Sequence, residues 1–195
     1  MKTFFKGFCI GLLSLSLLGL LWFLVLQPGL TNKEAQDLKE EYAQPLPGES
    51  SGELPAGKEQ AASLVNLSAL QAEYPDIQGW ISIPGTCVDY PVLQSSADEP
   101  EYYLRRTYKG EHRTAGSIFF QWDCSPESRN LVVYGHNMSD GTMFAVLQKM
   151  ADEAFRTEHS KILLQTSDGL WEYRIAAVLK TDITKLSFNR TEFAD

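Results

Sequence analysis

His136 is the residue in this sequence that is best placed to carry acid–base chemistry. It follows the hydrophobic run 132–134, which is typical of a β-strand, with only Gly135 between them. The end of a strand fixes a side chain while the following loop leaves it accessible. Imidazole exchanges protons near neutral pH, so we predict a general acid or base at this position, against the alternative of a structural histidine.

The other two histidines lie in different surroundings. His112 is flanked by Glu111 and Arg113, and His159 directly follows Glu158. We expect both to be solvated surface residues. None of the three histidines has zinc-motif spacing to a cysteine or another histidine, so the sequence gives no reason to expect a metal site.

Two cysteines beyond the N-terminal region could act as nucleophiles. Cys87 lies between a turn and a strand, and Cys124 lies in a polar loop, whereas Cys9 falls inside an apolar run. The sequence leaves three interpretations of Cys87 and Cys124 open: a disulfide, a nucleophile paired with His136, or two ordinary thiols. Spacing alone does not show that any of them meet.

Composition excludes several classes of function. The chain has 195 residues and 44% hydrophobic residues, enough for one packed domain plus a terminal appendage. Its 17 basic and 25 acidic residues give a net charge of −8, which argues against binding nucleic acid. Neither GxxxxGK[ST] nor GxGxxG occurs, so the common nucleotide-binding loops are absent from the sequence.

The N-terminal region predicts a membrane anchor and a spacer. Residues 7–26 contain no charged side chain, and an uncharged helix of that length spans a bilayer. Residues 1–6 carry two lysines and are expected to stay cytoplasmic, which places the rest of the chain outside the membrane. Residues 27–60 are predicted to be an extracytoplasmic linker, within which 31–42 could form a charged helix.

The remaining chain predicts a mainly β domain with flanking helices. Leucines spaced by three indicate an amphipathic helix over 61–74, and 141–150 has an apolar helical face. Short β-rich runs occupy 80–83, 88–93, 117–121 and 131–134. Segments 161–166 and 170–181 flank Ser167-Asp168-Gly169 and predict a hairpin. Many short strands and few helices favour a barrel or a sandwich.

The order of these blocks resembles the class B sortases from about residue 66 onward. The first block is Asp76-Ile77-Gln78-Gly79-Trp80-Ile81-Ser82-Ile83-Pro84-Gly85-Thr86-Cys87-Val88-Asp89-Tyr90-Pro91-Val92-Leu93-Gln94, and the second is Gly116-Ser117-Ile118-Phe119-Phe120. The third is Tyr134-Gly135-His136-Asn137-Met138, followed by Asp140-Gly141-Thr142-Met143-Phe144. The third block is similar to the family's catalytic-histidine segment.

The resemblance implies a fold and a reaction. Sortases are cysteine transpeptidases of Gram-positive cell surfaces, built on an eight-stranded β-barrel that class B members precede with an N-terminal helix. Their thiolate cleaves a C-terminal sorting signal after threonine, and an amine of a peptidoglycan precursor or a pilin resolves the thioester. His136 inherits the acid–base role, and the resemblance implies no metal or cofactor. Leu104 and Phe188 are the expected substrate-binding residues.

One part of the family pattern is not found. The Thr-Leu-Ser-Thr-Cys-like strand has no counterpart in the sequence, and neither Arg174 nor Arg190 matches the family arginine. We therefore expect 61–195 to form an incomplete sortase-like barrel that is truncated at the C-terminus and poorly stable or inactive by itself. The alternatives are a non-catalytic sortase-fold module that binds sorting-signal peptides and an unrelated anchored β-domain.

Overall fold

The structure, a computed structural model, describes residues 11–19, 27–44, 64–182 and 184. Within these ranges, no helix combines the length and the hydropathy needed to cross a bilayer. Residues 11–19 are helical and exposed, and they cover only part of the span predicted over 7–26. The rest of that span lies outside the described residues, so the membrane anchor stays a prediction.

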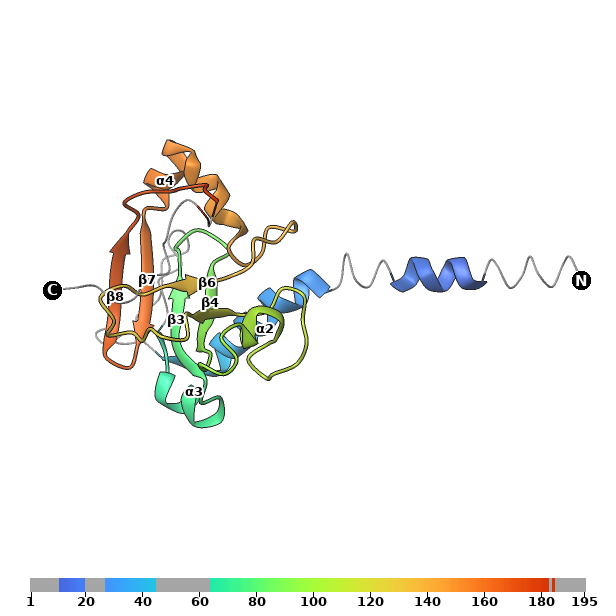
Figure 1. Cartoon of the computed structure of the whole chain (residues 1–195), viewed down its shortest axis with the longest axis horizontal. Coiled ribbons are helices and arrows are strands. Elements are labelled where there is room, and N and C mark those ends of the chain that lie inside the picture. Colours follow the sequence, from blue (N-terminus) through green and yellow to red (C-terminus); the bar gives the residue numbers. More distant parts are fainter. Residues whose placement is uncertain (1–10, 20–26, 45–63, 183, 185–195) are drawn as a thin grey trace, which may run out of the picture.

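A six-stranded sheet forms the centre of the domain (Figure 1). The strand order is β6-β5-β4-β3-β7-β8, and every neighbouring pair is antiparallel except β4 and β5. The strands predicted from hydrophobic alternation are therefore confirmed, and the described strands form an open sheet. Their bounds are β3 Ile77–Ser82, β4 Asp89–Gln94, β5 Ile118–Phe120, β6 Val133–Tyr134, β7 Lys161–Thr166 and β8 Gly169–Arg174.

Alternating side chains supply a core on each face of the sheet. On β5, Ile118 and Phe120 enter one buried cluster, whereas Phe119 enters the other. β4 repeats the pattern, with Val92 in the first cluster and Leu93 in the second. This period of two follows from the pleat of a strand and explains why the central strands are almost continuously apolar.

Helix α2 (Gln27–Glu41) belongs to the folded domain, which corrects its assignment to the linker. The sequence did indicate a charged helix over 31–42, and the structure contains it. Ala35 and Leu38 are buried against the sheet, and the helix contacts β4. The sequence did not indicate this docking, because only Ala35 and Leu38 are buried apolar residues of the helix and most of its other residues are polar.

The helix predicted over 61–74 is shorter than expected. α3 spans Leu67–Glu73, and residues 64 and 65 instead form strand β2 (Leu64–Val65), paired with β1 (Ala43–Gln44). Asn66 explains the later start, because its side chain accepts a hydrogen bond from the Ala69 amide at 3.1 Å and so caps the helix. α3 packs on β3 through buried leucines in the second cluster.

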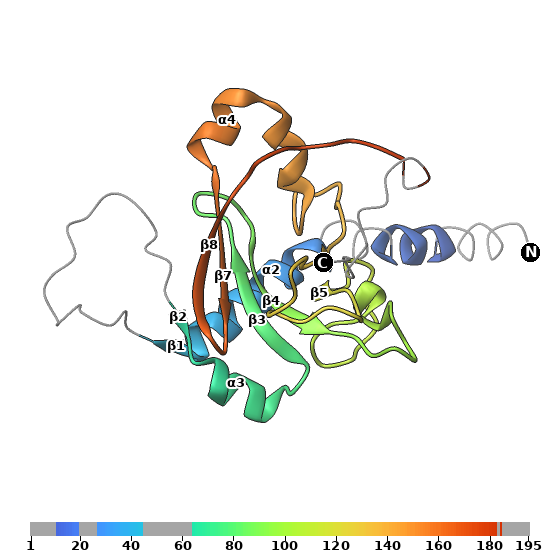
Figure 2. The same ribbon diagram turned by 60° about the vertical axis from the view of Figure 1, so that its left-hand side comes forward.

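Two short helices follow the His136 segment. The helix predicted over 141–150 is a 3₁₀ helix, η3 (Ala145–Ala151), with Val146 and Met150 buried in the first cluster. α4 (Glu153–Glu158) is capped by Asp152, whose carboxylate accepts a hydrogen bond from the Phe155 amide at 2.8 Å. α4 and α3 lie at opposite ends of the sheet in both views (Figures 1 and 2).

The hairpin predicted from Ser167-Asp168-Gly169 is confirmed, although its second strand ends at residue 174 rather than 181. Every residue of β8 is exposed, and Trp171 is 52% exposed. Among the described strands β8 pairs only with β7, at the outer side of the sheet in Figure 2. Among the described strands, β8 therefore presents exposed apolar side chains at an edge of the sheet, and the truncation stays a prediction.

Candidate functional site

His136 lies immediately after β6, in the position that the strand-end argument predicted. β6 pairs with β5 through Phe119 and Tyr134, and the tyrosine hydroxyl donates to Gln121 Oε1 at 2.7 Å. These contacts anchor the strand two residues before the imidazole. The sheet therefore fixes the backbone from which His136 projects.

The approach of a second segment explains the glycine before the histidine. A Cβ atom built on Gly135 would lie 2.6 Å from the Phe144 ring, closer than real contacts allow. The Phe144 amide donates to the His136 carbonyl at 2.9 Å, and Asn137 pairs with Met143. Residues 137–143 thus form a closed loop, here called the histidine loop, whose two ends meet at His136 and Phe144.

The His136 imidazole is half-buried and electrostatically unusual. Burial lowers its pKa below the ordinary value of 6.5, and the nearby Arg105 guanidinium lowers the pKa further. Its Nδ1 atom is buried and has no hydrogen-bond partner among the described residues. A buried ring nitrogen without a partner is costly, and a purely structural role for His136 does not explain it.

Arg105 is a site residue that the sequence argument missed. It ends the 3₁₀ helix η2 (Tyr102–Arg105), and its Nη1 donates to the Thr114 carbonyl at 3.0 Å. That bond holds the side chain where its charge acts on His136. The only signal in the sequence was its position next to Leu104, because electrostatic reach across 31 residues of chain leaves no local pattern.

Leu104, a predicted substrate-binding residue, is half-buried in η2 beside the second core cluster. Gly116 makes this position possible, since a Cβ atom there would lie 2.3 Å from the Leu104 carbonyl oxygen. Leu104 directly precedes Arg105, whose charge lowers the pKa of His136. Phe188, the other predicted substrate contact, lies outside the described residues.

The two described cysteines are free thiols with hydrogen bonds elsewhere. Cys87 Sγ donates to the Gly141 carbonyl of the histidine loop at 3.1 Å, and Cys124 Sγ donates to the Gln121 carbonyl at 3.3 Å. Burial is the main cause that raises the pKa of each thiol above 9.0. The disulfide interpretation is therefore wrong in this structure, and burial disfavours the thiolate form of both cysteines.

The two remaining histidines differ from each other. His112 is exposed, as predicted. His159 was expected to be solvated, but only 11% of its side chain is exposed, its ring packs on Phe155, and its Nδ1 lies 3.0 Å from the Pro84 carbonyl. The charged residues before His159 suggested a solvent-exposed position. His159 instead directly follows α4, on the side that faces the β3–β4 turn.

Comparison with known proteins identifies the family. The sortase domain model matches residues 81–193. Sortase B of Listeria monocytogenes is 39% identical over 131 residues, which cover 66% of this chain and 52% of the relative. Sortase B of Staphylococcus aureus is 34% identical over 129 residues, covering 65% and 52%. The chain spans about half the length of the curated relatives it matches.

Solved structures give the same answer. The Staphylococcus aureus sortase B–substrate complex has a TM-score of 0.61 and 33% identity, with 66% of this chain and 59% of that chain covered. A C232S mutant form of Clostridium perfringens sortase B has a TM-score of 0.60 and 30% identity, with 66% and 61% covered. This chain, with His136 at the end of a strand of the matched sheet, belongs to the sortase family.

Proposed function

We propose that this chain carries the acid–base histidine of a class B sortase-like cysteine transpeptidase. The enzyme would cleave a C-terminal sorting signal after threonine and join the new carboxyl end to an amine of a peptidoglycan precursor or a pilin. The observation that carries the proposal is His136 itself, half-buried at a strand end with Nδ1 unpartnered among the described residues. Similarity to sortase B proteins supplies the reaction class.

In this reaction a thiolate attacks the threonine carbonyl carbon and the peptide C–N bond breaks. The leaving amine takes a proton from imidazolium at position 136, and a thioester remains on the enzyme. An acceptor amine then attacks the thioester, loses a proton to neutral imidazole and displaces the thiolate. Because its pKa is lowered, His136 is mainly neutral at pH 7 and is a stronger acid when protonated.

The nucleophile of this reaction is neither Cys87 nor Cys124. The pKa of both thiols is raised, and a sortase nucleophile must react as a thiolate. We therefore propose that the 195-residue chain by itself transfers no acyl group at a sortase-like rate. Product formed by this chain alone at the rate of a complete sortase would refute that part of the proposal.

Leu104 and Phe188 are proposed to line the groove for the sorting signal. Leu104 is half-buried in η2 and directly precedes Arg105, so a bound peptide there would lie beside the charge that acts on His136. The related sortase B of Staphylococcus aureus has been solved as a substrate complex, which supports a peptide groove in this fold. The non-catalytic alternative, a module that only binds sorting signals, shares this groove but not the chemistry.

We also propose that residues 7–26 anchor the chain in the cell membrane, with the N-terminus cytoplasmic and the domain extracytoplasmic. The uncharged run and the two preceding lysines support this topology. Carbonate extraction of membranes should leave the chain in the pellet, and externally added protease should digest the domain. Release into the carbonate supernatant would contradict the anchor.

A fusion protein tests the catalytic role directly. The Cys-bearing and Arg-bearing strands of the Listeria sortase B would be joined after residue 182, and the product assayed with a sorting-signal peptide and triglycine by mass spectrometry. We expect an amide product, and His136→Ala should lower its rate by about 10²- to 10⁴-fold. A folded but inactive fusion, or one that tolerates His136→Ala, would overturn the transpeptidase proposal.

A further inference from the structure

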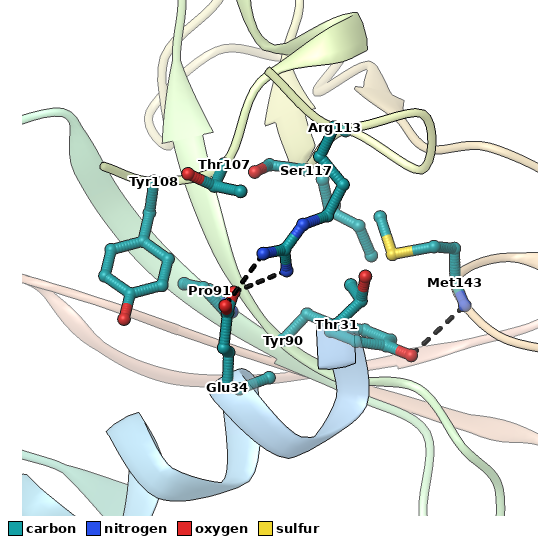
Figure 3. Close-up of a pocket in the computed structure, with 12 residues that line it drawn as sticks. Thr31, Glu34, Tyr90, Pro91, Thr107, Tyr108, Arg113, Ser117 and Met143 are labelled. Carbon is teal, nitrogen blue, oxygen red and sulfur yellow. Dashed lines mark hydrogen bonds and ion pairs between the residues drawn. The ribbon is translucent and has the colours of Figure 1, made fainter. Parts of the chain in front are cut away.

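A small cavity lies between helix α2 and strand β4, beside the histidine loop (Figure 3). Its lining includes Thr31 and Ala35 of α2, Tyr90 of β4 and Met143 of the loop. The cavity measures about 30 Å³, room for about one water molecule and far too small for a peptide. The residues around it therefore serve to connect elements rather than to bind a substrate.

Tyr90 makes the central connection. Tyr90 is 3% exposed, and its hydroxyl donates to Asn32 Oδ1 of α2. The same hydroxyl accepts a hydrogen bond from the Met143 amide at 3.1 Å (Figure 3). Burial is the main cause that raises the pKa of Tyr90, so the phenol keeps its proton and its role as donor. One buried hydroxyl thus joins the N-terminal helix to the histidine loop.

Met143 is a constrained point of that loop. Its φ is +55°, the only positive φ of a non-glycine residue in the described ranges, and its side chain is 1% exposed. Such a backbone conformation costs free energy and persists only where surrounding contacts impose it. Those contacts are the hydrogen bond to the Tyr90 hydroxyl, the pairing of Met143 with Asn137, and the hydrogen bond that the Phe144 amide donates to the His136 carbonyl.

The path from α2 to the imidazole is therefore short and continuous. Asn32 holds the Tyr90 hydroxyl, the hydroxyl holds the Met143 amide, and the residue after Met143 holds the His136 carbonyl. The same helix is fastened to the sheet side by the Glu34–Arg113 ion pair, with N–O distances of 2.5 and 2.8 Å (Figure 3). Movement of α2 would reach the loop through Tyr90.

We propose that Tyr90 and Asn32 are positioning residues. Through them, the docking of α2 determines where His136 lies and how well its ring is shielded from water. Neither residue touches the reacting atoms, and both act through the histidine loop. The proposal rests on the proposed role of His136, but its test measures titration rather than turnover. Failure of the transpeptidation assay and failure of this test are therefore separate results.

The experiment follows the full 195-residue chain by NMR. The His136 ring is titrated through its carbon-bound protons, and the exchange of the Met143 amide with deuterium is measured in parallel. Tyr90→Phe removes only the hydroxyl, and Asn32→Ala removes only its acceptor. In both variants the Met143 amide should exchange about tenfold faster, and the His136 pKa should rise toward its ordinary value because water reaches the ring.

Two matched controls separate positioning from general loss of stability. Tyr103 is equally buried at 3% exposure and donates to Asp76, but it belongs to the other core cluster. Gln36 is on α2 and lies 3.5 Å from Asp89, a carboxylate that Lys39 of the same helix also binds at 2.6 Å, so the loss of Gln36 leaves α2 docked. Tyr103→Phe and Gln36→Ala should leave both readouts at their wild-type values.

The outcomes are distinct. A change in both readouts for Tyr90→Phe and Asn32→Ala, with the controls unchanged, supports the relay. If Tyr90→Phe fails to fold, Asn32→Ala alone decides. A wild-type His136 titration in either of the two relay variants, or an equal change in Tyr103→Phe, would overturn it.

Discussion

Strands β5 and β8 lie in the same sheet and both carry large apolar side chains, yet their environments are opposite. All three residues of β5 are buried, and all six residues of β8 are exposed. β5 has a paired strand on each side and a core cluster on each face, whereas β8 has one paired neighbour among the described strands. Position in the sheet, rather than strand composition, decides how much each side chain stabilises the domain.

The largest test of this contrast removes one aromatic side chain from each strand. Phe120→Ala should lower the free energy of unfolding by about 3–5 kcal/mol, because Phe120 is fully buried. Trp171→Ala removes a larger side chain that is 52% exposed, and it should cost under about 1 kcal/mol. Urea unfolding of both variants measures the difference, and equal losses would refute the contrast.

A smaller effect is expected next to His136. Gly135→Ala forces a methyl group against the Phe144 ring and should cost about 1–3 kcal/mol by overpacking. Adding Phe144→Leu removes the ring edge and should restore part of that loss. If the double variant were no more stable than Gly135→Ala, contact with Phe144 would not be the cause.

The ion pairs of the two regions should differ in the same direction as their aromatic residues. Arg113 is only 12% exposed in its pair with Glu34, whereas both side chains of Lys161–Glu172 on the β7–β8 hairpin are more than 40% exposed. Glu34→Gln should cost about 1–2 kcal/mol, and Glu172→Gln under about 0.5 kcal/mol. Urea titrations at low and high salt would check this, and a larger loss for Glu172→Gln would contradict it.

A still smaller effect should appear as a pH dependence of the free energy of unfolding, caused by the half-buried His136. The pKa of His136 in the folded chain lies below the ordinary value of 6.5, so the unfolded chain binds its proton more readily. This contribution to stability is present above pH 6.5 and is lost as the pH falls through the folded pKa. His136→Asn should flatten the stability profile between pH 8 and 5. An unchanged profile would contradict the burial of the ring.

The smallest expected change in stability is accompanied by a change in the binding of a hydrophobic dye. Trp171→Thr keeps β propensity and should alter the free energy of unfolding by less than about 0.5 kcal/mol. It should nevertheless reduce binding of a hydrophobic dye, because exposed apolar surface on an edge strand is what such dyes and other chains recognise. Dye binding equal to that of the wild type would show that the β8 face is not the exposed apolar site.

The sequence predicted the strands better than it predicted the helices. Alternation located β3, β4, β5 and β7 because each carries its apolar residues in a continuous local run. α2 was assigned to a spacer because its docking depends on partners far along the chain. Asp89 meets Lys39 across 50 residues, and Arg113 meets Glu34 across 79.

The candidate site divides along the same line. His136 was predicted because a strand end, a glycine and a histidine are adjacent in the sequence. Tyr90 was predicted only as part of the β-rich run 88–93, and its burial agrees with a place in the core. Its link to Asn32 spans 58 residues and its link to Met143 spans 53, so no local pattern could have revealed either contact.

Trp80 offers an optical consequence of the way α2 is seated. Its indole Nε1 donates to Asp89 Oδ1 at 2.7 Å, and Lys39 of α2 donates to the other oxygen of that carboxylate at 2.6 Å. Detaching the helix would remove the ammonium group and admit solvent to the indole, which is 4% exposed. In a chain whose other tryptophans are replaced by phenylalanine, a red shift of fluorescence would therefore report helix release before the sheet unfolds.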